Sequence, residues 1–163
     1  DSDDYNKLNA IKTFPAHHEV DAPIQFWLAY WKTQGLRFPV DFDPLVVKTM
    51  IAIESSFKPT AASRKSTATG LMQITNSTRR DLSGQRRNGY RLIKDHIISI
   101  NQVDLNDPLI NIAAGIRWLA AKFQQIPSGH KRNTHNLLKA YNQWNEEGDA
   151  YAKKVLQLYE QSK

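Results

Sequence analysis

Apolar positions recur at helical spacing along most of the chain. The clearest pattern follows Asp107-Pro108, where apolar residues fit the i, i+3, i+4, i+7 template of an amphipathic helix. They are Leu109, Ile112, Ala113, Ile116, Leu119, Ala120 and Phe123. Asp107 suits the N-cap, because its carboxylate can accept from a free N–H of the first turn. Pro127 and Gly129 end the pattern, so a long helix is predicted between these limits.

Four other apolar runs predict shorter helices. They cover residues 22–35, 43–54, 134–144 and 150–159. The first opens at Ala22-Pro23 and stops at Gly35, which is the usual asymmetry of proline at a helix start and glycine past its end. Asp43-Pro44 starts the second in the same way as Asp107-Pro108 starts the long helix. Gly148-Asp149 is predicted to be the turn between the last two.

The stretch from residue 82 to residue 106 has the weakest pattern. Gly84 and Gly89 bracket an arginine-containing segment, which fits either a short β-hairpin or an arginine-rich loop. Residues 97–100 are β-prone but too few to decide the matter. The fold class is therefore mostly α, as a single domain over residues 21–163. Residues 1–20 are expected to form a loosely attached N-terminal arm.

Composition narrows the function classes. A chain of 163 residues with 40% hydrophobic and 23% charged residues is typical of one globular domain. The absence of cysteine excludes disulfides and thiolate sites, and the five histidines share no metal-ligand spacing. We therefore expect no metal and no cofactor. The longest stretch free of charged residues has 13 residues and is polar, so no transmembrane segment is expected. The acidic start, Asp1-Ser2-Asp3-Asp4, does not fit a secretion signal.

The net charge of +6 indicates a polyanionic partner, such as nucleic acid, anionic lipid or an acidic cell-wall polymer. Much of the positive charge lies between residues 79 and 94, which contain six arginines and lysines. No nucleic-acid-binding motif accompanies this cluster. A non-enzymatic basic module that binds nucleic acid is therefore only a remote alternative.

Glu54 is the acid that stands out, since no other acid lies between Asp43 and Asp81. It continues the apolar stripe of its helix, in register with Val47 and Met50. Burial there would raise the pKa of the carboxyl, and a protonated carboxylic acid beside a cleft can protonate a glycosidic oxygen. The alternative is structural, in which Glu54 bonds neighbouring groups near the helix end.

Four short motifs extend this interpretation. They are Glu54-Ser55-Ser56-Phe57-Lys58-Pro59-Thr60-Ala61 with Ser63 and Gly70-Leu71-Met72-Gln73-Ile74, then Asp107-Pro108 with Asn111, Gly115 and Trp118, then Ala140-Tyr141-Asn142, then Tyr151 to Leu156. In this order, over roughly residues 40–160, they resemble the soluble lytic transglycosylase (SLT) family, which cleaves the glycan of bacterial peptidoglycan. The resemblance implies a lysozyme-like fold similar to goose-type lysozyme, with a cleft between two lobes.

The resemblance also implies roles for individual residues. Glu54 would be the sole catalytic acid: it would protonate the oxygen between MurNAc and GlcNAc and then deprotonate the MurNAc 6-hydroxyl, leaving a 1,6-anhydro end. Ser55 would support the loop. The residues expected to bind substrate are Ser63, Met72, Gln73, Tyr141 and Asn142. Three of them have structural alternatives: Ser63 as a turn residue, Met72 as a core filler and Tyr141 as a core aromatic.

Two matters stay open at this level. A hydrolytic muramidase on the same fold would also use Glu54, with a second acid from a distant segment. The candidates for that acid are Asp81, Asp104, Glu146 and Glu147. The segment from Arg64 to Gly70 also departs from the family pattern, since it lacks the usual proline and first glycine and has one extra residue. This departure puts substrate preference in doubt and hints at a specialised wall-cutting protein.

The expected partner is the glycan strand of peptidoglycan, with no nucleic acid. A protein inhibitor, an immunity partner or a secretion machine is a further possibility. The expected location is the periplasm or cell envelope, or a target cell wall if the protein is a secreted antibacterial effector. Wall turnover, secretion-system assembly and phage entry are other roles that this sequence leaves open.

Overall fold

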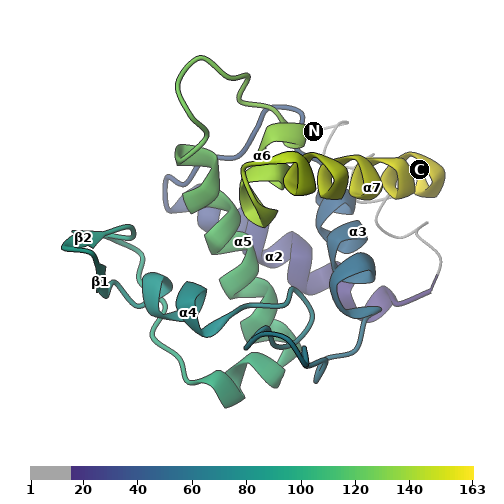
Figure 1. The fold of residues 1–163 in the computed structure, drawn as a ribbon. Helices are drawn as coiled ribbons and strands as arrows, with labels where there is room; N and C mark the ends of the chain where they lie inside the picture. The colour runs from purple at the N-terminus through teal and green to yellow at the C-terminus, as the bar shows by residue number, and fades with distance from the viewer. Residues whose placement is uncertain (1–15) are drawn as a thin grey trace.

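The computed structural model describes residues 16–163, and it is built almost entirely of helices (Figure 1). The α-helices of this range are α2 (Asp21–Thr33), α3 (Pro44–Ser55), α4 (Asn76–Leu82), α5 (Pro108–Gln124), α6 (Thr134–Asn142) and α7 (Glu146–Ser162). Two 3-10 helices, η1 (His18–Val20) and η2 (Gln102–Asn106), precede α2 and α5. The mostly helical fold class is therefore confirmed.

Helix α5 lies at the centre of the molecule (Figure 1) and contacts α2, α4, α6 and η2. Ile112, Ile116 and Leu119 of its apolar face are fully buried, whereas Leu109 at its start is 48% exposed. The Trp31 indole also donates a 3.1 Å hydrogen bond from α2 to the Ala113 carbonyl in α5. Helix α7 packs on α6 and α3, so both ends of the described chain contribute to one core.

Side-chain caps fix where most helices begin. Asp43 accepts from the Leu45 amide at 2.9 Å, and Asp107 accepts from the Leu109 amide at 2.9 Å. Each cap is followed by proline at the first helical position, as the sequence predicted. Helix α4 was not predicted, although Thr75 caps it by accepting from the Thr78 amide at 3.1 Å.

The predicted turn at Gly148-Asp149 is wrong, because both residues lie inside the first turn of α7. The break between α6 and α7 falls at residues 143–145, where Asn145 accepts from the Gly148 amide at 3.1 Å. A Cβ at position 148 would lie 1.6 Å from the Gln143 carbonyl oxygen. Glycine is therefore needed here for a close approach of two backbones, and not for a turn conformation.

The segment between residues 82 and 106 contains a short antiparallel hairpin. Strands β1 (Arg86–Arg87) and β2 (Tyr90–Arg91) pair through Arg86 with Arg91 and Arg87 with Tyr90. Asn88 and Gly89 at the turn both have positive φ, which matches the right-handed twist of the paired strands. Of the two possibilities the sequence left open, the hairpin is correct. Residues 97–100 form no strand.

The predicted N-terminal arm falls mostly on residues 1–15, which lie outside the described residues. Within the part that is described, Val20 is buried and leads directly into α2. No helix of residues 16–163 combines the length and the apolar character that crossing a membrane requires.

Candidate active site

Glu54 lies in the last turn of α3, just before the chain changes direction. Ser56 and Phe57 both adopt the left-handed conformation, with φ of 50° and 62°. These two residues end the helix and send the chain into the loop that carries Met72 and Gln73. The side chain of Glu54 faces a cavity of about 300 Å³.

Lining this cavity are residues from α3, the loop before α4, α4 itself, α5 and α6. They are Glu54, Gln73, Ile74, Thr75, Thr78, Trp118, Lys122, Tyr141 and Asn142. Glu54 is the only carboxylic acid among these residues. The structure therefore brings three of the residues expected to act on substrate, Gln73, Tyr141 and Asn142, together with Glu54.

The electrostatics of Glu54 are dominated by its burial. Loss of solvation raises the pKa of its carboxyl to about 7, while the positive charge of Lys154 offsets part of this rise. No hydrogen bond holds the carboxyl within residues 16–163. A carboxyl with this pKa is largely protonated in mild acid, so it can donate a proton to a leaving group.

Two tyrosines, the half-buried Tyr141 and the buried Tyr151, share the surroundings of Glu54. Burial raises the pKa of Tyr141 well above its usual value, and the charge of Glu54 adds to the rise. Burial and the charge of Glu54 raise the pKa of Tyr151 in the same way. Both hydroxyls therefore stay protonated and neutral, and that of Tyr141 donates its proton to the Met72 carbonyl at 2.8 Å.

The loop that carries Met72 and Gln73 is anchored by one residue of α5, Asn111. Its side-chain oxygen accepts from the Met72 amide at 2.8 Å, and its side-chain nitrogen donates to the carbonyls of Thr69 and Leu105 at 2.9 Å each. Asn111 is completely buried, so these bonds form away from water. Gln73 braces the same loop by donating to the Ala61 and Gly70 carbonyls at 3.1 and 2.9 Å.

The other three predicted site residues do not line the cavity. Met72 is fully buried, and its carbonyl accepts a 2.8 Å hydrogen bond from the Tyr141 hydroxyl. Ser55 is buried and donates to the Ile51 carbonyl at 3.0 Å within α3. Ser63 accepts from the Lys65 amide at 3.2 Å in a local turn.

Sequence reasoning did not foresee Thr78 or Lys122 in the site, and it gave Tyr151 no role there, although Tyr151 opens one of the four motifs that carry the family resemblance. Lys122 follows Trp118 by one helical turn, so its position next to the cavity could have been inferred from the Trp118 match. Thr78 belongs to α4, which was not predicted, and Tyr151 reaches Glu54 only through the packing of α7 on α3.

Replacing Tyr141 by phenylalanine is expected to lower the free energy of unfolding by about 1–3 kcal/mol, because it leaves the buried Met72 carbonyl without its donor. Tyr151→Phe is the matched control. Its hydroxyl is buried and has no hydrogen-bond partner among residues 16–163, so its removal should change stability by less than about 0.5 kcal/mol. Urea unfolding of both variants measures the difference. Equal losses in the two would contradict the assignment of the Tyr141 bond.

Residues 16–163 contain no group of three or more histidine, aspartate or glutamate side chains that could hold a metal ion. In the comparison with protein families, the model described as the Transglycosylase SLT domain matches residues 30–157, more than three quarters of the chain. The comparisons with curated proteins and with solved structures gave no match. SLT domains have a lysozyme-like fold and act on the peptidoglycan of the cell wall. The matched range contains the cavity around Glu54, and the chain belongs to the transglycosylase SLT domain family.

Proposed function

We propose that this protein cleaves the MurNAc–GlcNAc β-1,4 bond of peptidoglycan as a lytic transglycosylase, with Glu54 as its only catalytic carboxyl. The observation that carries the proposal is the solitary, half-buried Glu54 in the cavity, with its pKa raised to about 7. Family membership supplies the peptidoglycan-cleaving activity in general.

In the proposed first step, protonated Glu54 donates its proton to the oxygen that bridges the two sugars. The bond from this oxygen to the anomeric carbon of MurNAc breaks, and the GlcNAc part leaves as an alcohol. Positive charge develops on the anomeric carbon, where the N-acetyl carbonyl of the substrate can stabilise it in place of a second enzyme carboxylate.

In the proposed second step, the Glu54 carboxylate takes the proton of the MurNAc 6-hydroxyl. The 6-oxygen then bonds to the anomeric carbon and closes the 1,6-anhydro ring, so no water enters the products. The acid regains its proton in this step and is ready for another cycle.

The positions of the other acids support a one-carboxyl mechanism over a hydrolytic one with two. Asp81 accepts from Arg87 at 2.6 Å, and Asp104 accepts from the Asn101 amide at 2.8 Å in a capping box. Glu146 and Glu147 lie in the first turn of α7 and are exposed. None of these four lines the cavity that holds Glu54.

Digestion of purified sacculi followed by mass spectrometry tests the proposal. We expect muropeptides one water lighter than those released by a hydrolase. Products of full mass with free reducing ends would establish a muramidase instead. Absence of release from every sacculus tried would contradict the catalytic proposal altogether.

We further propose that the protein acts in the periplasm or envelope, or on a target cell wall to which it is delivered. The +6 net charge supports attraction to the anionic wall. An inhibitor, an immunity partner and secretion machinery stay predictions.

A further inference from the structure

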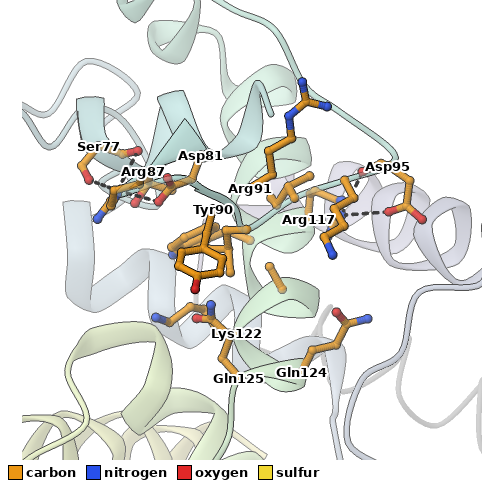
Figure 2. A pocket seen from close by; sticks show the side chains of 16 residues that line it. Ser77, Asp81, Arg87, Tyr90, Arg91, Asp95, Arg117, Lys122, Gln124 and Gln125 are labelled. Carbon is orange, nitrogen blue, oxygen red and sulfur yellow. Dashed lines mark hydrogen bonds and ion pairs between the residues drawn. The ribbon is translucent and has the colours of Figure 1, made fainter. Parts of the chain in front are cut away.

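A second and larger cavity, of about 710 Å³, adjoins the one that holds Glu54. The two share Thr78, Trp118 and Lys122 as lining residues. The larger cavity lies between the β1–β2 hairpin, the segment that follows it and the second half of α5 (Figure 2). A polymer seated beside Glu54 would therefore continue into it.

Positive charge dominates this second cavity, whose lining includes five lysines and arginines but only two carboxylates. Both carboxylates are already paired: Asp81 with Arg87 at 2.6 Å, and Asp95 with Arg117 at 3.7 Å. The pairs of Arg87 and Arg117 are drawn in Figure 2, where Arg87 also donates to Ser77. The cations that remain without an ion pair in residues 16–163 are Arg91, Lys94 and Lys122.

Of the three cations, Lys122 is the one that lines both cavities. It is half-buried at the junction of the two cavities, with its ammonium 5.4 Å from the centre of the Trp118 ring. Burial lowers the pKa of Lys122, and the nearby charge of Asp81 counteracts this. A partly desolvated cation is stabilised when an anion approaches, so its surroundings favour a ligand with negative charge.

Two aromatic rings accompany the cations. Tyr90 projects from β2 into the cavity and is 81% exposed, although it is a large side chain (Figure 2). Trp118, in α5, lines both cavities. Trp118 is 8% exposed, so Tyr90 supplies the exposed ring of this cavity: next to the charged groups it offers an apolar face to sugar or peptide and leaves the charges to recognise anionic substituents.

We infer that the larger cavity binds the peptide stem of the glycan strand, with Lys122, Arg91 and Lys94 pairing its carboxylates and Tyr90 covering its apolar parts. This inference rests on the proposed function, because it takes peptidoglycan as the polymer beside Glu54. The stem is the anion best placed to reach the cavity. It is covalently attached to MurNAc, one of the two sugars joined by the bond that Glu54 would cleave.

Binding to the inactive Glu54→Gln protein tests the inference without cleavage. The probes are soluble glycan strands that carry peptide stems and the same strands after an amidase has removed the stems. We expect the stem-bearing strands to bind about tenfold more tightly at low salt, and the difference to shrink at high salt. Adding Lys122→Met, Arg91→Gln and Lys94→Gln should remove the difference. Lys122→Met keeps a long side chain over Trp118.

The matched control changes charge away from both cavities. Lys32→Gln with Arg37→Gln removes two exposed cations that line neither cavity, and it should preserve the preference for stems. Equal affinity for both kinds of strand would overturn the inference, as would equal loss in the control and cavity variants. The inference would also be overturned if the protein bound the anionic polymer poly(glycerol phosphate) and showed no preference for strands that carry stems.

The outcome for the proposed function is read separately. Cleavage of sacculi by the unaltered protein together with no preference for stems would overturn only the inference. A stem preference that depends on Lys122, in a protein that cleaves no sacculus, would overturn the catalytic proposal and support the binding site.

Discussion

Glu54→Gln is expected to reduce the rate of peptidoglycan cleavage at least about a hundredfold, and up to about ten-thousandfold, because the amide cannot donate or accept the reacting proton. The side chain keeps nearly the same shape and stays in the same cavity, so binding of glycan should persist. Release of soluble muropeptides from sacculi measures the rate. The loss should appear in kcat and not in KM.

Glu160→Gln is the matched control for this prediction. Glu160 lies near the end of α7 in an exposed ion pair with Lys163, at 3.2 Å, and it lines neither cavity. The Glu160→Gln variant should cleave sacculi at the rate of the unaltered protein. If Glu54→Gln retained a tenth of the activity or more, another group would have to supply the proton.

The same group determines the expected pH dependence. In the proposed mechanism the Glu54 carboxyl must be protonated to start the reaction, and burial raises its pKa to about 7. We therefore expect kcat/KM to fall with rising pH above about 7, by tenfold per pH unit. A profile that stays flat to pH 9 would show that the protonation of Glu54 does not limit the first step.

Asn111→Leu should have the largest effect on stability. Leucine fills a similar volume, but it leaves the Met72 amide and the carbonyls of Thr69 and Leu105 without partners in a buried site. At about 1–3 kcal/mol for each unsatisfied group, we expect a loss of at least 3 kcal/mol and a fall in Tm of about 10 °C. Thermal unfolding followed by circular dichroism measures this.

Asn106→Leu provides the comparison, since Asn106 is half-buried near the same loop and its side chain makes no hydrogen bond in residues 16–163. Its Tm should change by no more than about 2 °C. The role of Asn111 as the anchor of the loop would be excluded if both variants melted together.

The helices were largely predictable because their signals are local. Asp43-Pro44 and Asp107-Pro108 carry both a cap and a proline, and each starts its helix as predicted. Gly148 was misread because a glycine signal does not distinguish a turn from a close contact. The close approach of the Gln143 carbonyl, in the connection between α6 and α7, decides between the two.

The candidate site was predictable where chemistry and pattern coincide in one helix. Glu54 places an acid on the apolar stripe of α3, and that conflict pointed to burial, which raises the pKa of its carboxyl. Tyr151 and Lys122 show no such conflict with their own helix pattern; only the Trp118 match one turn before Lys122 and the motif that begins at Tyr151 point to them. Their positions depend on how α7 and α5 pack against α3 and α4, and a tyrosine or lysine on a helix face is compatible with many environments.

The burial of Glu54 also makes the free energy of unfolding depend on pH. The folded pKa of about 7 lies above the ordinary value of 4.5, so between these pH values the folded chain keeps a proton that the unfolded chain has lost. The contribution of Glu54 to the free energy of unfolding is therefore largest below pH 4.5. It is lost as the pH rises toward 7. The loss amounts to about 3 kcal/mol.

At neutral pH and above, Glu54 thus destabilises the fold that holds it. Glu54→Gln should be more stable than the unaltered chain in alkaline buffer, and a new hydrogen-bond donor beside the carboxylate should have the same effect. Such a donor would also lower the pKa of the Glu54 carboxyl. Selection for thermal robustness and selection for wall cleavage therefore act in opposite directions at this one position.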